Sequence, residues 1–164
     1  MIEMEVDAEA LRALGRALKS EADGKELRKD LIRNLKKPLV PAVQKIKSSI
    51  LAMPSSGGSA GESLRRGVAK RIRAEAKLSG RNAGVRVRAR KTPTVRGFRD
   101  APKRLNSRKG WRHPVFGNRN LWVTQIGRPG FFDDPLNERK PELRRAVLEA
   151  MEDTARRIAS KARS

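Results

Sequence analysis

Apolar residues recur every three or four positions along two N-terminal stretches of the chain, which is the spacing of one face of an α-helix. Residues 8–19 carry leucines at this spacing, and residues 26–50 continue it with Lys and Arg on the opposite side. Pro38 and Pro41 interrupt the second stretch. Because proline removes a backbone donor and crowds the preceding turn, we expect a kink or break near Lys37. The apolar stripe should lie on the protein's own sheet or, alternatively, on a neighbouring subunit.

The hydrophobic period then changes from helical to alternating. Ser59 and Glu62 form a capping box that predicts a short helix. Residues 72–78 and 85–90 alternate apolar and polar side chains, and turn-forming residues 79–82 separate them, so the sequence predicts a β-hairpin. Like charges side by side on a sheet are destabilising, so its basic outer face suggests an anionic partner. That face carries Arg73, Lys77, Arg86, Arg88 and Arg90. Glu75 lies on the same face and partly offsets the repulsion between these positive charges.

Five of the six aromatic residues lie between positions 111 and 132. Because each buried ring removes a large apolar area from water, we expect them to form the structural core. Turn-forming residues 117–120 lie between two β-prone runs and predict a second hairpin. Residues 128–131, with proline second and glycine third, predict a type II turn. The expected core residues are Trp111, Phe116, Trp122, Phe131 and Phe132.

A long amphipathic helix is expected at the C-terminal end of the chain. Asp134 is suited to the N-cap and Pro135 to the first helical position. The apolar face continues from there to Ala162, with an irregularity expected at Pro141. The elements together predict an α+β fold, in which an antiparallel sheet of about four strands (two hairpins) is packed by N-terminal helices and this C-terminal helix.

The length of 164 residues favours a single domain, residues 1–164, with a helical N-terminal part at 1–53. The chain has no cysteine, which excludes disulfides, thiolate zinc sites and a cysteine nucleophile. The acidic start at residues 1–7 and the lack of an apolar run near the ~20 residues of a membrane span predict neither a signal peptide nor a transmembrane helix.

Positive charge is concentrated in the middle of the chain. The net charge is +21, and residues 65–112 hold 18 Lys and Arg against two acidic residues. Such a field attracts polyanions, of which nucleic acids are the abundant cytosolic ones; a solvated, solubilising surface is the alternative. Residues 91–110 show no usable period, so we expect a flexible basic loop within the domain, which is usually functional or ordered by a partner.

Catalytic chemistry is poorly supported by the sequence. His113 is the only histidine and has no spaced partner that would make it a general base. Asp133 and Asp134 could bind a metal, but capping of the following helix explains them better. The glycines of residues 57–61 lack the lysine of a phosphate loop. We therefore expect no enzyme activity and no catalytic, cofactor or metal site.

Three consecutive segments in the aromatic region carry a family resemblance. Residues 112–118 (RHPVFGN), 121–125 (LWVTQ) and 128–132 (RPGFF), followed by a long helix, resemble the head–tail joining or tail-completion proteins of long-tailed double-stranded DNA phages. The likeness extends to the N-terminal helices and to the loop 53–61 (MPSSGGSAG), which leads to Leu64-Arg65-Arg66. The proline pair and the long basic loop depart from the family pattern.

The resemblance implies a non-enzymatic virion protein that forms a ring, a hexamer, in the neck between the capsid's portal assembly and the tail tube. Implied partners are further copies of the chain, neighbouring neck and tail proteins (a stopper or adaptor, the tail tube or terminator) and double-stranded DNA, bound without sequence preference. Assembly would take place in the host cytoplasm. The rivals are a free basic nucleic-acid-binding protein and, more remotely, a metal-dependent nuclease.

In such a ring, we expect the basic segment to face DNA or a neighbouring subunit. The candidate contact residues are Arg73, Lys77, Arg86, Arg88, Arg90, Lys91, Arg96, Arg99, Lys103, Arg104, Arg108 and Lys109.

Overall fold

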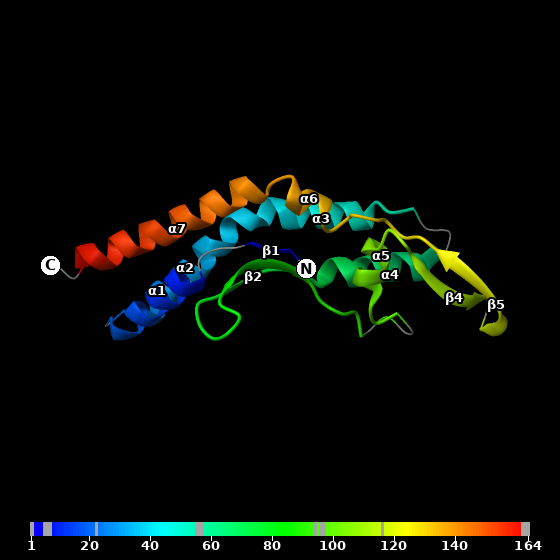
Figure 1. Ribbon diagram of the computed structural model, residues 1–164, viewed down its shortest axis with the longest axis horizontal. Coiled ribbons are helices and arrows are strands. Elements are labelled where there is room, and N and C mark those ends of the chain that lie inside the picture. Colours follow the sequence, from blue (N-terminus) through cyan, green and yellow to red (C-terminus); the bar gives the residue numbers. More distant parts are fainter. Residues whose placement is uncertain are drawn as a thin grey trace. The chain divides into compact units, whose positions relative to one another are not determined.

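The fold is α+β, as the sequence predicts (Figure 1). The computed structural model describes residues 2–4, 8–21, 23–54, 58–93, 95, 98–115 and 117–161. The chain divides into two compact units. Unit 1 comprises Met1–Val43, Ala74–Val87 and Arg139–Ser164, and unit 2 comprises Gln44–Arg73 and Arg88–Glu138.

The N-terminal helices follow the predicted pattern, including the break. Helix α1 spans Ala8–Ser20 and α2 spans Gly24–Lys36. A single 3₁₀ turn, η1, occupies Lys37–Leu39 before α3 continues over Val40–Leu51. Pro38 lies within η1. The expected interruption near Lys37 is therefore confirmed, and its cause is the missing backbone donor and the bulk of the proline ring.

Unit 1 buries its apolar stripes mainly between helices. Helix α7 (Lys140–Lys161) runs along α2, and α1 contacts both of them (Figure 1). The stripe of α2 thus lies largely against α1 and α7, whereas the sequence suggested the protein's own sheet or another subunit. The buried apolar residues of this unit are Leu11, Leu18, Leu31, Leu35, Leu39, Ala42, Val43, Leu78, Val85, Val87, Leu143, Val147 and Met151.

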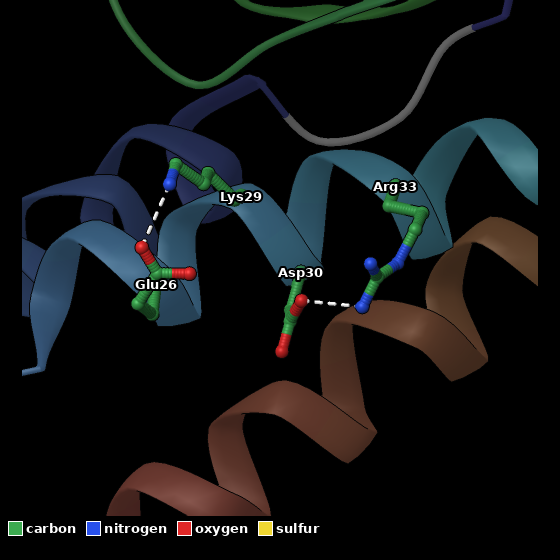
Figure 2. Close-up of polar contacts among 4 residues, drawn as sticks. All are labelled: Glu26, Lys29, Asp30 and Arg33. Carbon is green, nitrogen blue, oxygen red and sulfur yellow. Dashed lines mark hydrogen bonds and ion pairs between the residues drawn. The ribbon is translucent and has the colours of Figure 1, made fainter.

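The solvent-exposed side of α2 carries paired charges. Lys29 Nζ lies 2.7 Å from Glu26 Oε1, and Arg33 forms an ion pair with Asp30 one turn later (Figure 2). Pairs at this spacing stabilise a helix by only about 0.2–0.5 kcal/mol each. Their main consequence is that these basic residues are matched locally by carboxylates.

The first predicted hairpin forms part of a three-stranded sheet. Strands β2 (Ile72–Lys77) and β3 (Gly84–Ala89) lie beside each other, and a short strand, β1 (Ile2–Met4), pairs antiparallel with β3 on its other side. Ile2 is opposite Val87 and Met4 is opposite Val85. Both predicted hairpins are present, but each belongs to its own sheet, and the three-residue strand β1 was not predicted.

Unit 2 is built from short elements around a second small core. Helix α4 spans Gly58–Lys70 and α5 spans Ala101–Asn106. Strands β4 (Trp111–Val115) and β5 (Asn118–Gln125) form a two-stranded antiparallel sheet, and α6 spans Asp134–Asn137. The buried apolar residues of this unit are Ile46, Ile50, Val68, Ala69, Ile72, Ala101, Leu105, Phe131, Phe132 and Leu136.

Helix α5 lies within residues 91–110, the segment that the sequence predicts as a flexible basic loop because it shows no period. Ala101 and Leu105 are buried one turn apart, and Pro102 occupies the first turn, where its missing N–H is tolerated. Thr92 is also buried, and its hydroxyl donates to the carbonyl oxygen of Phe98 at 2.9 Å. The segment therefore contains a helix and a buried hydrogen bond, neither of which its polar composition indicates.

The chain enters its C-terminal helix through the predicted turn. The Phe131 amide donates to the Arg128 carbonyl at 3.2 Å, and Gly130 has a φ of +74°, as the third position of a type II turn requires. Helix α6 ends at Asn137, and α7 begins at Lys140 with Pro141 in its first turn. The irregularity expected at Pro141 is thus a separation of two helices.

An exposed ion pair at the start of α7 leads to a titration prediction. Arg139 donates through Nε and Nη2 to the Glu142 carboxylate, at 3.0 and 2.6 Å. This hydrogen bonding lowers the pKa of Glu142 below its ordinary value. The stabilisation is present above the ordinary glutamate pKa and is lost as the pH falls through the lowered pKa. Replacing Arg139 with Gln should therefore raise the pKa of Glu142, measured by NMR titration of its carboxyl carbon.

The matched control for this titration is Arg156→Gln, because Arg156 pairs with Asp153 farther along the same helix. This variant also removes one positive charge, from α7 itself, but leaves the Arg139 guanidinium in place. The pKa of Glu142 should stay where it is in the unaltered protein. An equal rise in both variants would mean that general charge, rather than the Arg139 hydrogen bonds, sets the pKa.

Candidate interaction surfaces

The basic face predicted for the first hairpin is only partly exposed. Arg73, Lys77 and Arg90 are exposed and Arg88 is half-buried. Arg86 is only 6% exposed, which makes its expected contact with DNA or another subunit wrong. The physical reason is its position on β3, the central strand of the sheet.

The Arg86 guanidinium is paired within the hairpin, although its buried Nε makes no hydrogen bond to the described residues. Its Nε lies 3.9 Å from Glu75 Oε2 on β2, and its Nη2 donates to the carbonyl oxygen of Asn82 at 3.1 Å. A buried guanidinium needs this kind of charge and hydrogen-bond compensation. Arg86 and Glu75 therefore hold β2 and β3 together, and the exposed charge of the hairpin is smaller than the sequence suggests.

The remaining basic candidates gather on and around α5. One of them, Lys91, forms an ion pair with Asp100 at 3.2 Å between Nζ and Oδ1. Arg96 lies outside the described residues. The exposed basic residues flanking or within α5 are Lys91, Arg99, Lys103, Arg104, Arg108 and Lys109, and together they are called the α5 surface.

The aromatic residues do not form one core. Phe131 and Phe132 are buried and contact each other edge to face, with ring centroids 6.4 Å apart. Trp111 is half-buried against Phe98, at 5.0 Å between centroids. Trp122 is 46% exposed, which corrects its assignment to the core, and Phe116 lies outside the described residues. The error at Trp122 arises because ring size indicates burial but does not identify what covers the ring.

The β4–β5 hairpin, with Ile126 immediately after it, carries exposed apolar side chains and is called the arm. Every residue of β5 is exposed. The pairing of His113 with Val123 and of Pro114 with Trp122 places Val123 and Trp122 on opposite faces of the ribbon. The exposed large apolar residues of the arm are Leu121, Trp122, Val123 and Ile126.

The exposed Trp122 ring is held in place rather than left free. Its Nε1 donates to the Arg119 carbonyl at 2.7 Å, and the Arg112 guanidinium carbon lies 5.8 Å from the ring centroid. A fixed aromatic side chain beside an arginine is a frequent anchor in protein interfaces, because little conformational entropy is lost on binding. Sequence reasoning missed this surface, although the unbroken apolar run 121–123 should have indicated a ribbon without a polar face.

The base of the arm is fixed to α5. The Arg128 amide donates to the Leu105 carbonyl at 2.9 Å, and the Gly130 amide donates to the Asn106 carbonyl at 3.3 Å. The Asn106 side chain accepts from the Phe132 amide at 3.0 Å and donates to Asp133 Oδ2 at 2.6 Å. The α5 surface and the root of the arm therefore belong to one hydrogen-bonded body within unit 2.

Asp133, and not Asp134 as expected, is the N-cap residue of α6, and Asp134 is the first helical residue. Asp133 precedes the helix and makes no side-chain capping hydrogen bond; it is bound by Asn106 instead. His113 is half-buried, with Nδ1 at 3.1 Å from the Pro114 carbonyl oxygen. Within the described ranges, no three His, Asp or Glu side chains are grouped so that they could hold a metal ion.

Among the residues that the structure describes, the apolar arm and the α5 surface are the candidates for function, and both are suited to binding. No helix within the described part of the chain has the length and apolarity needed to cross a membrane.

Comparisons of the chain with models of protein families, with curated proteins and with solved structures give no significant match.

Proposed function

We propose that this protein is a structural virion protein that forms a ring in the phage neck at the head–tail junction, as a head–tail connector, tail-completion or tail-terminator component. The observation that carries the proposal is the arm, with exposed apolar side chains on both of its faces. The basic segment would lie near the DNA channel. The resemblance of residues 112–132 to the phage family supports the same assignment, and it covers the arm itself.

Exposed apolar area on a two-stranded ribbon favours association with another surface. Each large apolar side chain that becomes fully buried contributes about 1.5–3 kcal/mol, and a hairpin standing alone is marginally stable in water. We infer that the arm binds a second copy of the chain. A ring would require the arm to meet a different part of its neighbour, because a repeated heterologous contact closes into a ring when the rotation permits.

The test is self-association of the full chain, measured as solution mass by light scattering over a range of protein concentrations. The unaltered protein should form a discrete multi-subunit particle. Trp122→Ser should raise the concentration needed for half-assembly by about tenfold or more, because it removes an anchor aromatic side chain. The control is Leu51→Ser, since Leu51 lies outside the arm and has the same exposure as Trp122, 46%.

Equal effects of the two substitutions would show that the arm is not the assembly surface. A protein that stays monomeric at every concentration would overturn ring formation. If such a monomer also binds DNA tightly and with steep salt dependence, the free nucleic-acid-binding protein becomes the better assignment.

A further inference from the structure

A shallow hollow of about 470 Å³ opens beside α5. Its lining is basic and polar, and it belongs entirely to unit 2. The residues around it are Lys91, Asp100, Lys103, Arg104, Ser107 and Gly110.

The positive charge at this hollow is not balanced locally. Asp100 is the only carboxylate among the described residues of the lining, and it already pairs with Lys91 at 3.2 Å. Among the described residues, Lys103 and Arg104 form no ion pair. The contrast with α2 is informative, because there Lys29 and Arg33 each have a carboxylate three residues away (Figure 2). Uncompensated cations repel one another, so an anion at the hollow would be stabilising.

Arg104 is also oriented before any ligand arrives. Its guanidinium carbon lies 5.4 Å from the centroid of the Phe98 ring, and Phe98 in turn contacts Trp111 at a tilted angle, with ring centroids 5.0 Å apart. A guanidinium resting on an aromatic face keeps its N–H groups available at the edge. Because Arg104 is exposed and already oriented, it loses less conformational freedom on binding than an unsupported arginine would.

We infer that this hollow binds the phosphate groups of a nucleic-acid backbone, with Arg104 as the anchoring residue and Lys103 beside it. Arginine donors match phosphate oxygens in a bidentate geometry. Arg108 and Lys109 continue the exposed positive charge past the end of α5, which fits a polymer with repeated phosphates better than a single ion. Contacts of this kind position DNA without reading its sequence.

This site deepens the proposed function, because it specifies which basic residues would meet DNA, but it does not require the ring. The Trp122→Ser protein, in which self-association is expected to be weakened, should still bind DNA at the α5 site. Loss of assembly and loss of DNA binding are therefore separately measurable, and failure of one inference leaves the other standing.

The test measures binding of the full chain to a short fluorescent DNA duplex by anisotropy at several salt concentrations. The double variant Lys103→Gln/Arg104→Gln should weaken binding by about tenfold or more, and it should reduce the slope of log affinity against log salt by about 2. The matched control is Arg144→Gln/Arg145→Gln. It also removes two adjacent, exposed charges, but from α7 in unit 1.

The control should change the affinity by less than about threefold, because its two charges do not line the hollow and contribute only to the net charge of the chain, which salt screens. Equal losses in both double variants would mean that DNA responds to net charge alone, which would overturn the site. No DNA binding by the unaltered protein would overturn it as well. If inorganic phosphate displaces the labelled duplex as effectively as unlabelled DNA at the same concentration of phosphate groups, the hollow is a site for small anions instead.

Discussion

The substitution Leu35→Ala should lower the free energy of unfolding by about 2–5 kcal/mol. Leu35 lies on α2, is 0% exposed, and belongs to the helical core that α2 forms with α1 and α7. Removing its branched end loses the transfer free energy of the deleted carbons and leaves a cavity that neighbouring helices fill only partly. The loss is large beside the about 5–15 kcal/mol that stabilises a typical domain.

Denaturant unfolding followed by circular dichroism measures this change as a shift of the midpoint at constant slope. The control is Leu148→Ala on α7, where the leucine is 37% exposed. A surface change of this kind should stay within about 0.5 kcal/mol. If both substitutions lower the free energy of unfolding equally, α2 does not form the core of unit 1 in solution.

The parts of the fold that could be predicted are those that a local pattern determines. The break after α2 follows from Pro38, and both hairpins follow from short runs of β-prone residues around turn formers. By contrast, β1 has three residues and α5 has six, so neither is long enough to display a period. Which hairpin joins which sheet depends on non-local pairing, and a local pattern carries no information about that.

The same limit explains the errors at the candidate surfaces. Alternation indicated that Val85 and Val87 on β3 would be buried, but it could not indicate that Arg86 between them would be buried as well, next to Glu75 on β2. Nor could it indicate that Trp122 would stay exposed while Phe131 and Phe132 form a core. Burial is a property of the assembled elements, and ring size or charge alone does not determine it.

Gly110→Ala should destabilise unit 2 strongly, by more than about 3 kcal/mol. Gly110 precedes β4 and has a φ of +66°. An alanine held at this φ would cost about 1–3 kcal/mol in backbone strain, before any clash is counted. A Cβ at this position would also lie 2.2 Å from the carbonyl oxygen of Gln125, the residue paired with Trp111. Because that oxygen belongs to the backbone, the contact cannot be relieved by turning a side chain, and the two strands must separate at the base of the arm.

Gly117→Ala isolates the conformational part of this effect. Gly117 lies at the tip of the same hairpin with a φ of +82°, and among the described residues nothing lies within 4 Å of its would-be Cβ. Its substitution should cost only the strain, about 1–3 kcal/mol. The chain's two tryptophans, Trp111 and Trp122, are both in the arm, so their fluorescence reports its unfolding directly. Equal destabilisation by both alanines would mean that the root of the arm is not closed against Gln125, and a loosely attached arm could not position Trp122 as an anchor for a neighbouring subunit.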